Sequence, residues 1–208
     1  MYQSVFLLHL NMSKAERTKQ LIIEKTAPIF NKRGYAGTSL TDMTDATGLT
    51  KGSVYGNFED KDDVAFAAFD YNMGKLIGQV REQQANQRSA LSKLQAFITV
   101  YRNGLQAPVL SDGCPIINMG TEADDTHPQL KEKVNAALAR WQKSVSAIIQ
   151  QGKMQGEFRE DVNATEFASL MIAMIEGGFT LSKISGDTSY LNQSLDRLER
   201  LILSELTK

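Results

Sequence analysis

The sequence has a single cysteine, Cys114, and only two histidines, His9 and His127, among its 208 residues. One cysteine excludes an intramolecular disulfide and any cysteine-rich zinc site, and two histidines leave too few ligands to complete another metal site. We therefore expect no metal and no cofactor. The low cysteine content fits a protein of the reducing cytoplasm.

An excess of charge of one sign is also missing. The 23 lysines and arginines nearly balance the 24 aspartates and glutamates, which gives a net charge of -1. Bulk charge therefore does not indicate a nucleic-acid partner, and any contact with DNA must come from cations placed locally. The largest local excess lies between Lys14 and Arg33, where six cations stand against two acids.

Long hydrophobic runs are absent near the start of the chain. The apolar run at residues 5–8 is far shorter than a membrane span, and no cationic region or cleavage site frames it. We expect no membrane partner. Met12, followed by Ser-Lys-Ala-Glu-Arg, looks like the natural opening of a soluble protein, so residues 1–11 are interpreted as an extension. The alternative is an ordered arm that packs on the body.

Motifs of catalysis are missing as well. The sequence contains no Gly-x-Ser-x-Gly elbow, phosphate-binding glycine-rich loop or His-Glu-x-x-His helix. Glu122, Asp124 and Asp125 are clustered acids without histidines, and a solvated helix start explains them better than a metal site. We do not expect an enzyme.

What the sequence does contain is helical periodicity along almost its whole length. Apolar residues recur at spacings of three and four, and no stretch shows the sustained alternation of a strand. Such stripes start at Ile23, Leu91, Val134, Phe167 and Leu191. The predicted fold is all-α, with about nine helices whose short connections favour antiparallel neighbours. Only Pro28 conflicts with this pattern, because proline removes a helix donor and can kink the segment.

Two short helix patterns separated by a glycine-centred turn lie within residues 34–61. Ser39 and Asp42 have the spacing of a capping box, so one helix is predicted to start there and to break at Gly48. Thr50 is the expected N-cap of the next helix. That helix is predicted to bury Val54 and Phe58 at the i, i+4 spacing and to present Lys51, Ser53, Tyr55 and Asn57 on its other face.

The presented side chains suit the major groove of DNA. Gly52 and Ser53 allow close approach to the duplex, and Lys51 can neutralise a phosphate or reach a guanine edge. Asn57 has the donor and acceptor pair that an adenine edge accepts, and Tyr55 offers a hydroxyl to a phosphate or a ring to a thymine methyl.

Backbone amides at the helix starts near Ser39 and Lys61 are natural phosphate sites. The run Gly-Tyr-x-x-Thr-Ser-Leu-x-Asp-Met-x-x-Ala-x-Gly-Leu-Thr-Lys-Gly-Ser-Val-Tyr-x-Asn-Phe-x-x-Lys resembles the amino-terminal DNA-binding domain of the TetR family of transcriptional regulators. Many members carry His where this chain has Asn57. With the resemblance added, the candidate DNA-binding residues are Thr38, Ser39, Thr50, Lys51, Gly52, Ser53, Tyr55, Asn57 and Lys61.

The resemblance also implies a domain organisation and a function. Residues 12–60 would form the helix-turn-helix DNA-binding domain, and residues 61–208 a larger helical domain for effector binding and dimerisation. A homodimer would bind double-stranded DNA at a palindromic operator and be released by a small-molecule effector, with repression as the family tendency. The alternative is a helical adaptor without sequence-specific DNA binding.

The sequence has its own argument for a dimer. The segment from residue 167 to 181 is apolar on more than one face, and a Gly-Gly pair within it permits close backbone approach. The alternative is that this helix and the next only cap their own domain. The predicted interface residues are Phe167, Leu170, Met171, Met174, Gly178, Leu195, Leu198 and Ile202.

An effector cavity is expected among the helices of the middle region. Trp141 is the strongest candidate for its wall, because the ring is large and the indole N–H needs a partner. Ordinary core packing is the alternative for each candidate. The candidates are Phe66, Phe97, Tyr101, Cys114, Trp141 and Met174.

The segment at residues 112–122, Asp-Gly-Cys-Pro-Ile-Ile-Asn-Met-Gly-Thr-Glu, is similar to an element of one group of TetR-type regulators, some of which sense electrophiles or oxidants. If a helix start stabilises its thiolate, Cys114 could react with an electrophilic effector. The alternative is a small buried residue at a helix junction. His127 and Pro128 predict a helix start, with the proline at the first helical position.

Overall fold

The computed structural model describes residues 12–108 and 110–208, and the segment interpreted as an extension, residues 1–11, lies outside them. Within the described residues the chain forms nine α-helices, which confirms the predicted all-α fold. The helices are α2 (Lys14–Arg33), α3 (Leu40–Thr47), α4 (Lys51–Tyr55), α5 (Lys61–Gln84), α6 (Ala90–Gly104), α7 (Pro115–Thr126), α8 (Pro128–Met154), α9 (Ala164–Ser185) and α10 (Ser189–Leu201). A π-helical turn, Ile202–Leu206, follows α10.

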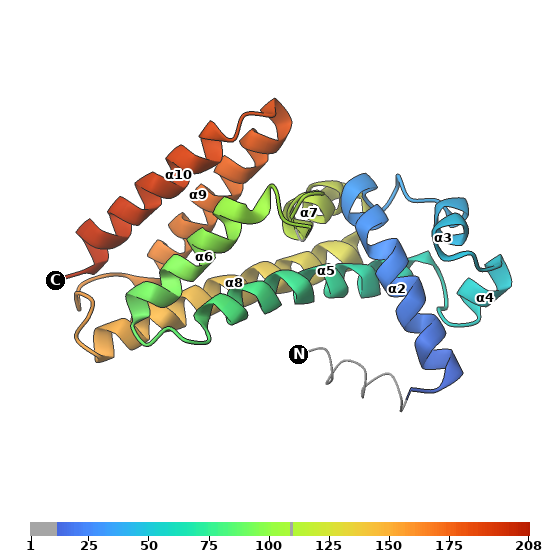
Figure 1. Ribbon diagram of the computed structural model, residues 1–208, viewed down its shortest axis with the longest axis horizontal. Coiled ribbons are helices and arrows are strands. Elements are labelled where there is room, and N and C mark those ends of the chain that lie inside the picture. Colours follow the sequence, from blue (N-terminus) through green and yellow to red (C-terminus); the bar gives the residue numbers. More distant parts are fainter. Residues whose placement is uncertain (1–11, 109) are drawn as a thin grey trace.

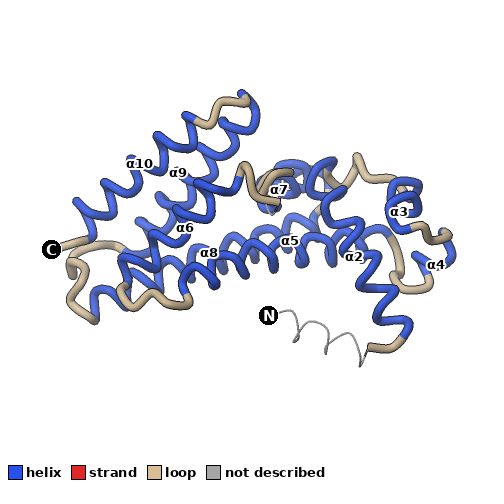
Figure 2. The backbone as a smooth tube through the Cα atoms, in the orientation of Figure 1, coloured by secondary structure: helices blue, strands red, loops and turns tan. Residues whose placement is uncertain are grey.

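The molecule is elongated, with α2, α3 and α4 at one end and the carboxy terminus at the other (Figure 1). The two long helices α5 and α8 run along its length between these ends (Figure 1). The antiparallel pair α9 and α10 lies obliquely beyond α6, and short loops join most neighbours (Figure 2). The short helices are therefore held at the end of the molecule, away from the bulk of the core.

Side-chain caps fix where several helices begin. Ser13 and Glu16 form a capping box at the start of α2, and Asp60 accepts from a backbone N–H in the first turn of α5. His127 Nδ1 accepts from the backbone N–H of Leu130 at 3.2 Å, and α8 begins at Pro128 as predicted. α2 runs through Pro28 without interruption.

The helix α5 connects the two ends of the molecule. Its first half buries Val64, Ala68 and Phe69, and α5 packs extensively against α2. The side chain of Asn72 donates to the carbonyl oxygen of Ala27 at 2.8 Å, which joins α5 to α2. Its second half faces α6 and α8, so one helix belongs to both halves of the molecule.

The helices α9 and α10 pack against each other within one chain, and this packing buries most of the residues predicted for the dimer interface. A Cβ at Gly178 would lie 2.7 Å from the Cβ of Ser194, so the glycine allows the two helices to approach closely. The strongest apolar stripe of an amphipathic helix faces its own core. Only Leu170 and part of Met174 reach the surface, because the other predicted residues are buried. Those buried residues are Phe167, Met171, Gly178, Leu195, Leu198 and Ile202.

Candidate nucleic-acid interface and ligand cavity

The helices α3 and α4 are fixed by caps close to those predicted from the sequence. The hydroxyl of Ser39 accepts from the backbone N–H of Asp42 at 3.1 Å, and the carboxylate of Asp42 accepts from the backbone N–H of Ser39 at 2.8 Å. Gly48 adopts a left-handed conformation with φ of 69° and ends α3. The hydroxyl of Thr50 accepts from the N–H of Ser53 at 3.2 Å and starts α4. Local hydrogen bonds therefore define both helices and the turn between them.

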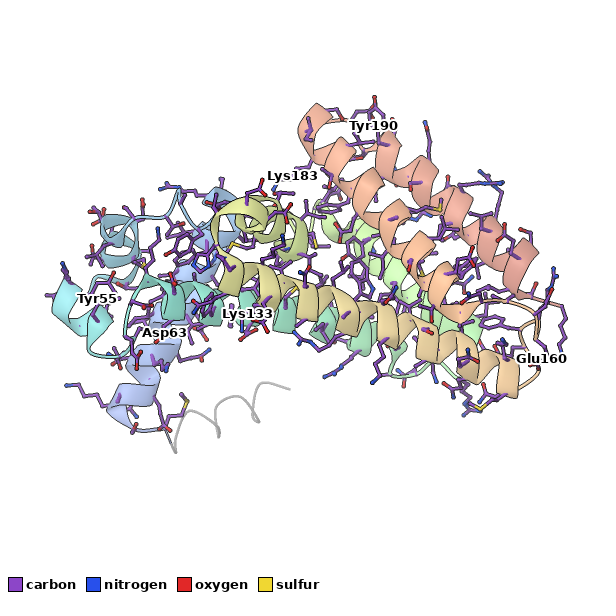
Figure 3. All side chains as sticks on the ribbon, turned by 180° about the vertical axis from the view of Figure 1, so that it is seen from behind. Tyr55, Asp63, Lys133, Glu160, Lys183 and Tyr190 are labelled. Carbon is purple, nitrogen blue, oxygen red and sulfur yellow. The ribbon has the colours of Figure 1, made fainter. Side chains whose placement is uncertain are left out.

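The helix α4 is shorter than predicted. It ends at Tyr55, so Phe58 lies beyond the helix rather than one turn along it. Phe58 is nonetheless buried, as is Val54, and the ammonium group of Lys19 lies 4.9 Å from the centre of the Phe58 ring. Figure 3 places Tyr55 at the end of the molecule. Buried residues on both sides of Tyr55 thus fix this segment to the core.

Most of the predicted DNA-binding residues lie on the surface of this end. Thr50, Lys51 and Gly52 are exposed, and Ser53 and Tyr55 are half-buried. The side-chain amide of Asn57, also half-buried, donates to the carbonyl oxygen of Ser53 at 2.8 Å. The ammonium group of Lys61 lies 4.3 Å from the centre of the Tyr35 ring. The surface therefore combines cations, hydroxyls and backbone that a duplex can approach.

Thr38 does not belong to this surface. Its side chain is fully buried, and its hydroxyl donates to the carbonyl oxygen of Gly34 at 2.7 Å. The hydroxyl therefore satisfies the end of α2 and is not available to DNA in this conformation. Ser39 beside it is exposed, although its hydroxyl is engaged in the cap of α3.

A carboxylate on α7 joins the body of the molecule to the end of α2. Glu122 accepts from the backbone N–H groups of Tyr35 and Ala36, at 2.6 and 2.5 Å. Gly34 has φ of 74°, and a Cβ there would lie 2.0 Å from Glu122 Oε2. The missing side chain at position 34 therefore makes room for the carboxylate. The interpretation of Glu122 as a solvated acid is wrong, because its hydrogen-bond partners lie 86 and 87 residues away in the sequence.

A second set of hydrogen bonds reinforces this junction. The buried amide of Asn31 donates to the carbonyl oxygen of Gly113 at 2.9 Å. The amide of Asn118 donates to the carbonyl oxygens of Asn31 and Asp112, at 2.7 and 2.8 Å. The glycine, asparagine and glutamate of the residue 112–122 segment therefore connect the body to α2. In the sequence, the cysteine is the conspicuous residue of this segment, and no local signal predicts these long-range contacts.

An ionisable cluster lies at the same junction. The hydroxyl of Tyr35 donates to Asp62, and the Nε2 atom of His127 lies 3.2 Å from the other carboxylate oxygen of Asp62. Burial, together with the adjacent Asp62 carboxylate, raises the pKa of Tyr35 to about 12. The hydrogen bond from Tyr35 in turn lowers the pKa of Asp62. The starts of α5 and α8 thus meet the end of α2 in one polar cluster.

A cavity of about 220 Å³ lies between α5, α6 and α8. Three of the six predicted wall residues line it, namely Phe97, Tyr101 and Trp141. The Trp141 ring stacks on the Tyr101 ring with their centres 5.6 Å apart and their planes 5° from parallel. Two arginines that sequence analysis missed, Arg81 and Arg140, also line the cavity.

Phe66, Cys114 and Met174 do not line this cavity. The Phe66 ring lies at the junction described above, with its centre 5.9 Å from that of His127. Met174 lies on α9, where its carbonyl oxygen accepts from the hydroxyl of Ser194 at 2.6 Å. Helical spacing predicts which residues turn inward, but it does not distinguish a cavity wall from close-packed core.

Cys114 lies in a buried polar group behind the cavity. The hydroxyl of Tyr101 donates to Glu176 Oε1 at 3.0 Å and lies 3.9 Å from Cys114 Sγ. Cys114 is 1% exposed, and burial, with Glu176 nearby, raises the pKa of its thiol. A reactive cysteine needs an accessible, stabilised thiolate. The structure therefore favours the structural interpretation of Cys114 over the electrophile sensor.

Two further observations concern other classes of protein. Within residues 12–108 and 110–208, no three His, Cys, Asp or Glu side chains are placed to hold a metal ion. The helix α9 is long and apolar enough to cross a membrane, but half of its most apolar stretch is buried in the fold. The core helix of a soluble protein has this same character.

Comparisons with known proteins agree with this geometry. The family described as "Bacterial regulatory proteins, tetR family" matches residues 22–68, and the family described as "Tetracyclin repressor-like, C-terminal domain" matches residues 90–198. Among curated proteins, the HTH-type transcriptional repressor DhaR of Mycobacterium sp. (strain GP1) is 26% identical over 182 residues, which cover 85% of this chain and 88% of DhaR.

Two solved structures are more similar to this chain in sequence than DhaR is. A TetR-family transcriptional regulator from Cytophaga hutchinsonii is 41% identical, with a TM-score of 0.87 over 95% of this chain and 99% of that one. A TetR transcriptional regulator from Chloroflexus aurantiacus J-10-FL is 35% identical, with a TM-score of 0.89 over 94% of this chain and 99% of that one. With its capped helix-turn-helix at one end and its helical body at the other, the chain belongs to the TetR family of DNA-binding transcriptional regulators.

Proposed function

We propose that the protein is a repressor that binds a palindromic operator as a homodimer and is released from it by a small molecule. The observation that carries the proposal is the two-sided character of α4. Val54 fixes the helix to the core, while Lys51 and Gly52 remain exposed at the end of the molecule. A reading helix must be held rigidly and still reach the groove.

The proposed DNA contacts follow from this surface. Lys51, Tyr55 and Asn57 would contact base edges or phosphates, and Gly52 and Ser53 would allow α4 to enter the groove. Phosphates would bind at the helix starts near Ser39 and Lys61, together with Thr50. Thr38 is left out of the set because it is buried. The cations of α2 supply the local positive charge that a nearly neutral chain otherwise lacks.

We keep the proposed division into residues 12–60 for DNA binding and 61–208 for effector binding and dimerisation. The first family match reaches residue 68, within α5, which agrees with the packing of α5 against α2. A regulator of this kind acts where the DNA is, so we place it in the bacterial cytoplasm. The family consists of regulators, and we propose no enzymatic activity.

The homodimer is proposed to form through an apolar stripe of α9 that α10 leaves uncovered. This uncovered stripe consists of Leu170, Ala173, Gly177, Leu181 and Ile184, all exposed and spaced at three, four or seven residues. Leu181 is 51% exposed and Ile184 is 79% exposed. Such a face on a helix favours burial against a second copy. It keeps Leu170 from the interface predicted from the sequence and leaves out the residues that are buried in this chain.

Release is proposed to pass from the cavity to α7. Tyr101 lines the cavity and contacts Cys114, which is the residue that precedes α7. Four residues and eight residues further along, Asn118 and Glu122 hold the end of α2. A ligand that shifts Tyr101 would therefore move the helix that positions the DNA-binding end.

The test is binding to DNA from around the gene, measured by fluorescence anisotropy at several salt concentrations. The wild-type protein should bind a palindromic segment with salt-dependent affinity, and Lys51→Ala and Tyr55→Ala should each weaken binding by roughly 5- to 150-fold. Lys143→Ala removes the same charge from an exposed position on α8 and should bind normally.

Unaltered binding by both α4 variants would refute the groove assignment. A folded wild-type protein that binds no DNA specifically would favour the alternative of a helical adaptor. The same assay tests release, since a small molecule that occupies the cavity should lower the affinity for the operator.

A further inference from the structure

We infer that the cavity between α5, α6 and α8 takes a small hydrophobic carboxylate, a short apolar body that carries one negative charge. The inference deepens the proposed function, because it rests on the proposal that this cavity is the effector site. It names the chemical class of the ligand from the residues that line the cavity.

The volume of the cavity and its lining residues indicate the size and the apolar character of the ligand. The volume of about 220 Å³ exceeds the roughly 150 Å³ of a cavity that binds benzene and lies below the roughly 300 Å³ where drug-sized pockets begin. Met73, Leu76 and Val80 of α5 line one side, and Phe97 of α6 with Trp141 of α8 lines another. A short alkyl or single-ring compound fills such a space.

Two arginines on different helices indicate that the ligand carries a negative charge. Arg81 of α5 and Arg140 of α8 both line the cavity, and both are exposed. Neither forms an ion pair within the part of the chain that the structure describes. No acid occurs three or four residues from either arginine on its helix, and among the described residues no carboxylate lines the cavity. Two cations without a protein partner at the edge of an apolar cavity favour an anionic ligand.

Neutral polar groups accompany the arginines. Gln84 and Ser144 also line the cavity and can donate to a carboxylate. The buried indole nitrogen of Trp141 has no hydrogen-bond partner among the described residues, which marks this wall as incompletely satisfied. An apolar cation would meet two like charges here, and a neutral compound would leave both arginines unused.

Trp141 makes the inference directly testable, because it is the single tryptophan of the chain. Octanoate, octan-1-ol and octylamine share one chain length and differ in charge. Titrations of the full-length protein without DNA, followed by tryptophan emission, should show saturable binding of octanoate at least about tenfold tighter than that of octan-1-ol, and weaker binding still of octylamine.

Variants of the two cavity arginines test the contribution of their charge separately from that of the apolar wall. Arg81→Ala and Arg140→Ala should each weaken octanoate binding by about tenfold and leave octan-1-ol binding unchanged. Arg88→Ala, an exposed arginine in the loop after α5, should leave both unchanged. Because all three arginines are exposed, circular dichroism should show folded variants.

Equal binding of octanoate and octan-1-ol, or octanoate binding that is insensitive to both cavity arginines, would overturn the inference. Absence of any response of Trp141 to all three probes would do the same. The effector role is read separately, from operator affinity with and without octanoate. Selective octanoate binding without any change in operator affinity would support the ligand class and overturn the proposed release.

Discussion

Glu176 places a carboxyl group inside the most apolar helix of the protein. Its side chain is 6% exposed, Oε1 accepts from Tyr101, and Oε2 has no partner among the described residues. Burial raises the pKa of this carboxyl above its ordinary value of 4.5. The folded protein therefore binds a proton here over a pH range in which the unfolded chain has already released it.

This shift predicts how stability depends on pH. A raised pKa in the folded state means that the contribution of Glu176 is most favourable below about pH 4.5 and is lost as the pH rises through the folded value. Glu176→Gln, which keeps an acceptor for Tyr101 and cannot ionise, should be more stable than wild type at pH 8 by about 1 to 2 kcal/mol. Urea unfolding between pH 5 and 8 measures this difference.

The matched control is Glu160→Gln, an exposed position in the loop before α9. Its stability profile should follow that of the wild type. Parallel profiles for wild type and Glu176→Gln would show that Glu176 does not titrate differently in the folded state.

Single residues also show where sequence reasoning succeeds. The caps at Ser39 and Thr50 were predictable, because their partners lie three residues away along the chain. The burial of Thr38 was not predictable, because it depends on how α2 ends and packs. The same holds for Arg81 and Arg140, since nothing in their local sequence places them beside one cavity.

At the scale of elements, α7 connects the half of the molecule that contains the cavity to the end that carries α3 and α4. It contributes Glu122 and Asn118 to the end of α2, and Cys114 just before it contacts Tyr101. Hydrogen bonds thus supplement the apolar packing of α7, which buries Ile116, Met119 and Ala123. A helix held in this way can transmit a small displacement.

Glu122→Ala should therefore destabilise the junction. Two backbone N–H groups lose a charged acceptor, which should lower the free energy of unfolding by about 2 to 4 kcal/mol. Thermal and urea unfolding measure the loss, and operator binding measured in parallel should respond less to an effector. Asp125→Ala, exposed on the same helix, should change stability by less than about 0.5 kcal/mol. Equal stabilities of the two variants would contradict this role of Glu122.

The helices were predicted better than the faces through which they pack. Periodicity predicted an all-α fold and the long helices that carry a clear apolar stripe, and the caps predicted the two short helices α3 and α4. For α10, periodicity predicts the helix but not what it packs against, because Leu195 and Leu198 form a stripe that would suit either its own core or a partner. Only the packing of α9 shows which faces remain uncovered.

At the scale of the whole molecule, the proposed dimer would let two α4 helices reach the two halves of one palindrome together. A double variant, Leu181→Glu with Ile184→Glu, places charges on the uncovered stripe of α9 and should shift the protein to a monomer in sedimentation at micromolar concentration. Operator affinity should fall with it. Met154→Glu introduces a charge at an apolar position of α8 that is 81% exposed, and should stay dimeric. A wild-type monomer, or a dimeric double variant, would refute the proposed interface.

The helix α5 extends from the packing against α2 to the cavity. Its first half packs against α2 and its second half lines the cavity, in a single helix of 24 residues. A rod of that size is about 36 Å long, so a tilt of about 5° at the ligand would displace its far end by about 3 Å. In the proposed release, α5 would act together with α7 as a lever arm that converts a small change at the cavity into a displacement of the DNA-binding end. A glycine pair introduced at its middle would make the helix less stiff and should reduce the response of operator binding to a ligand.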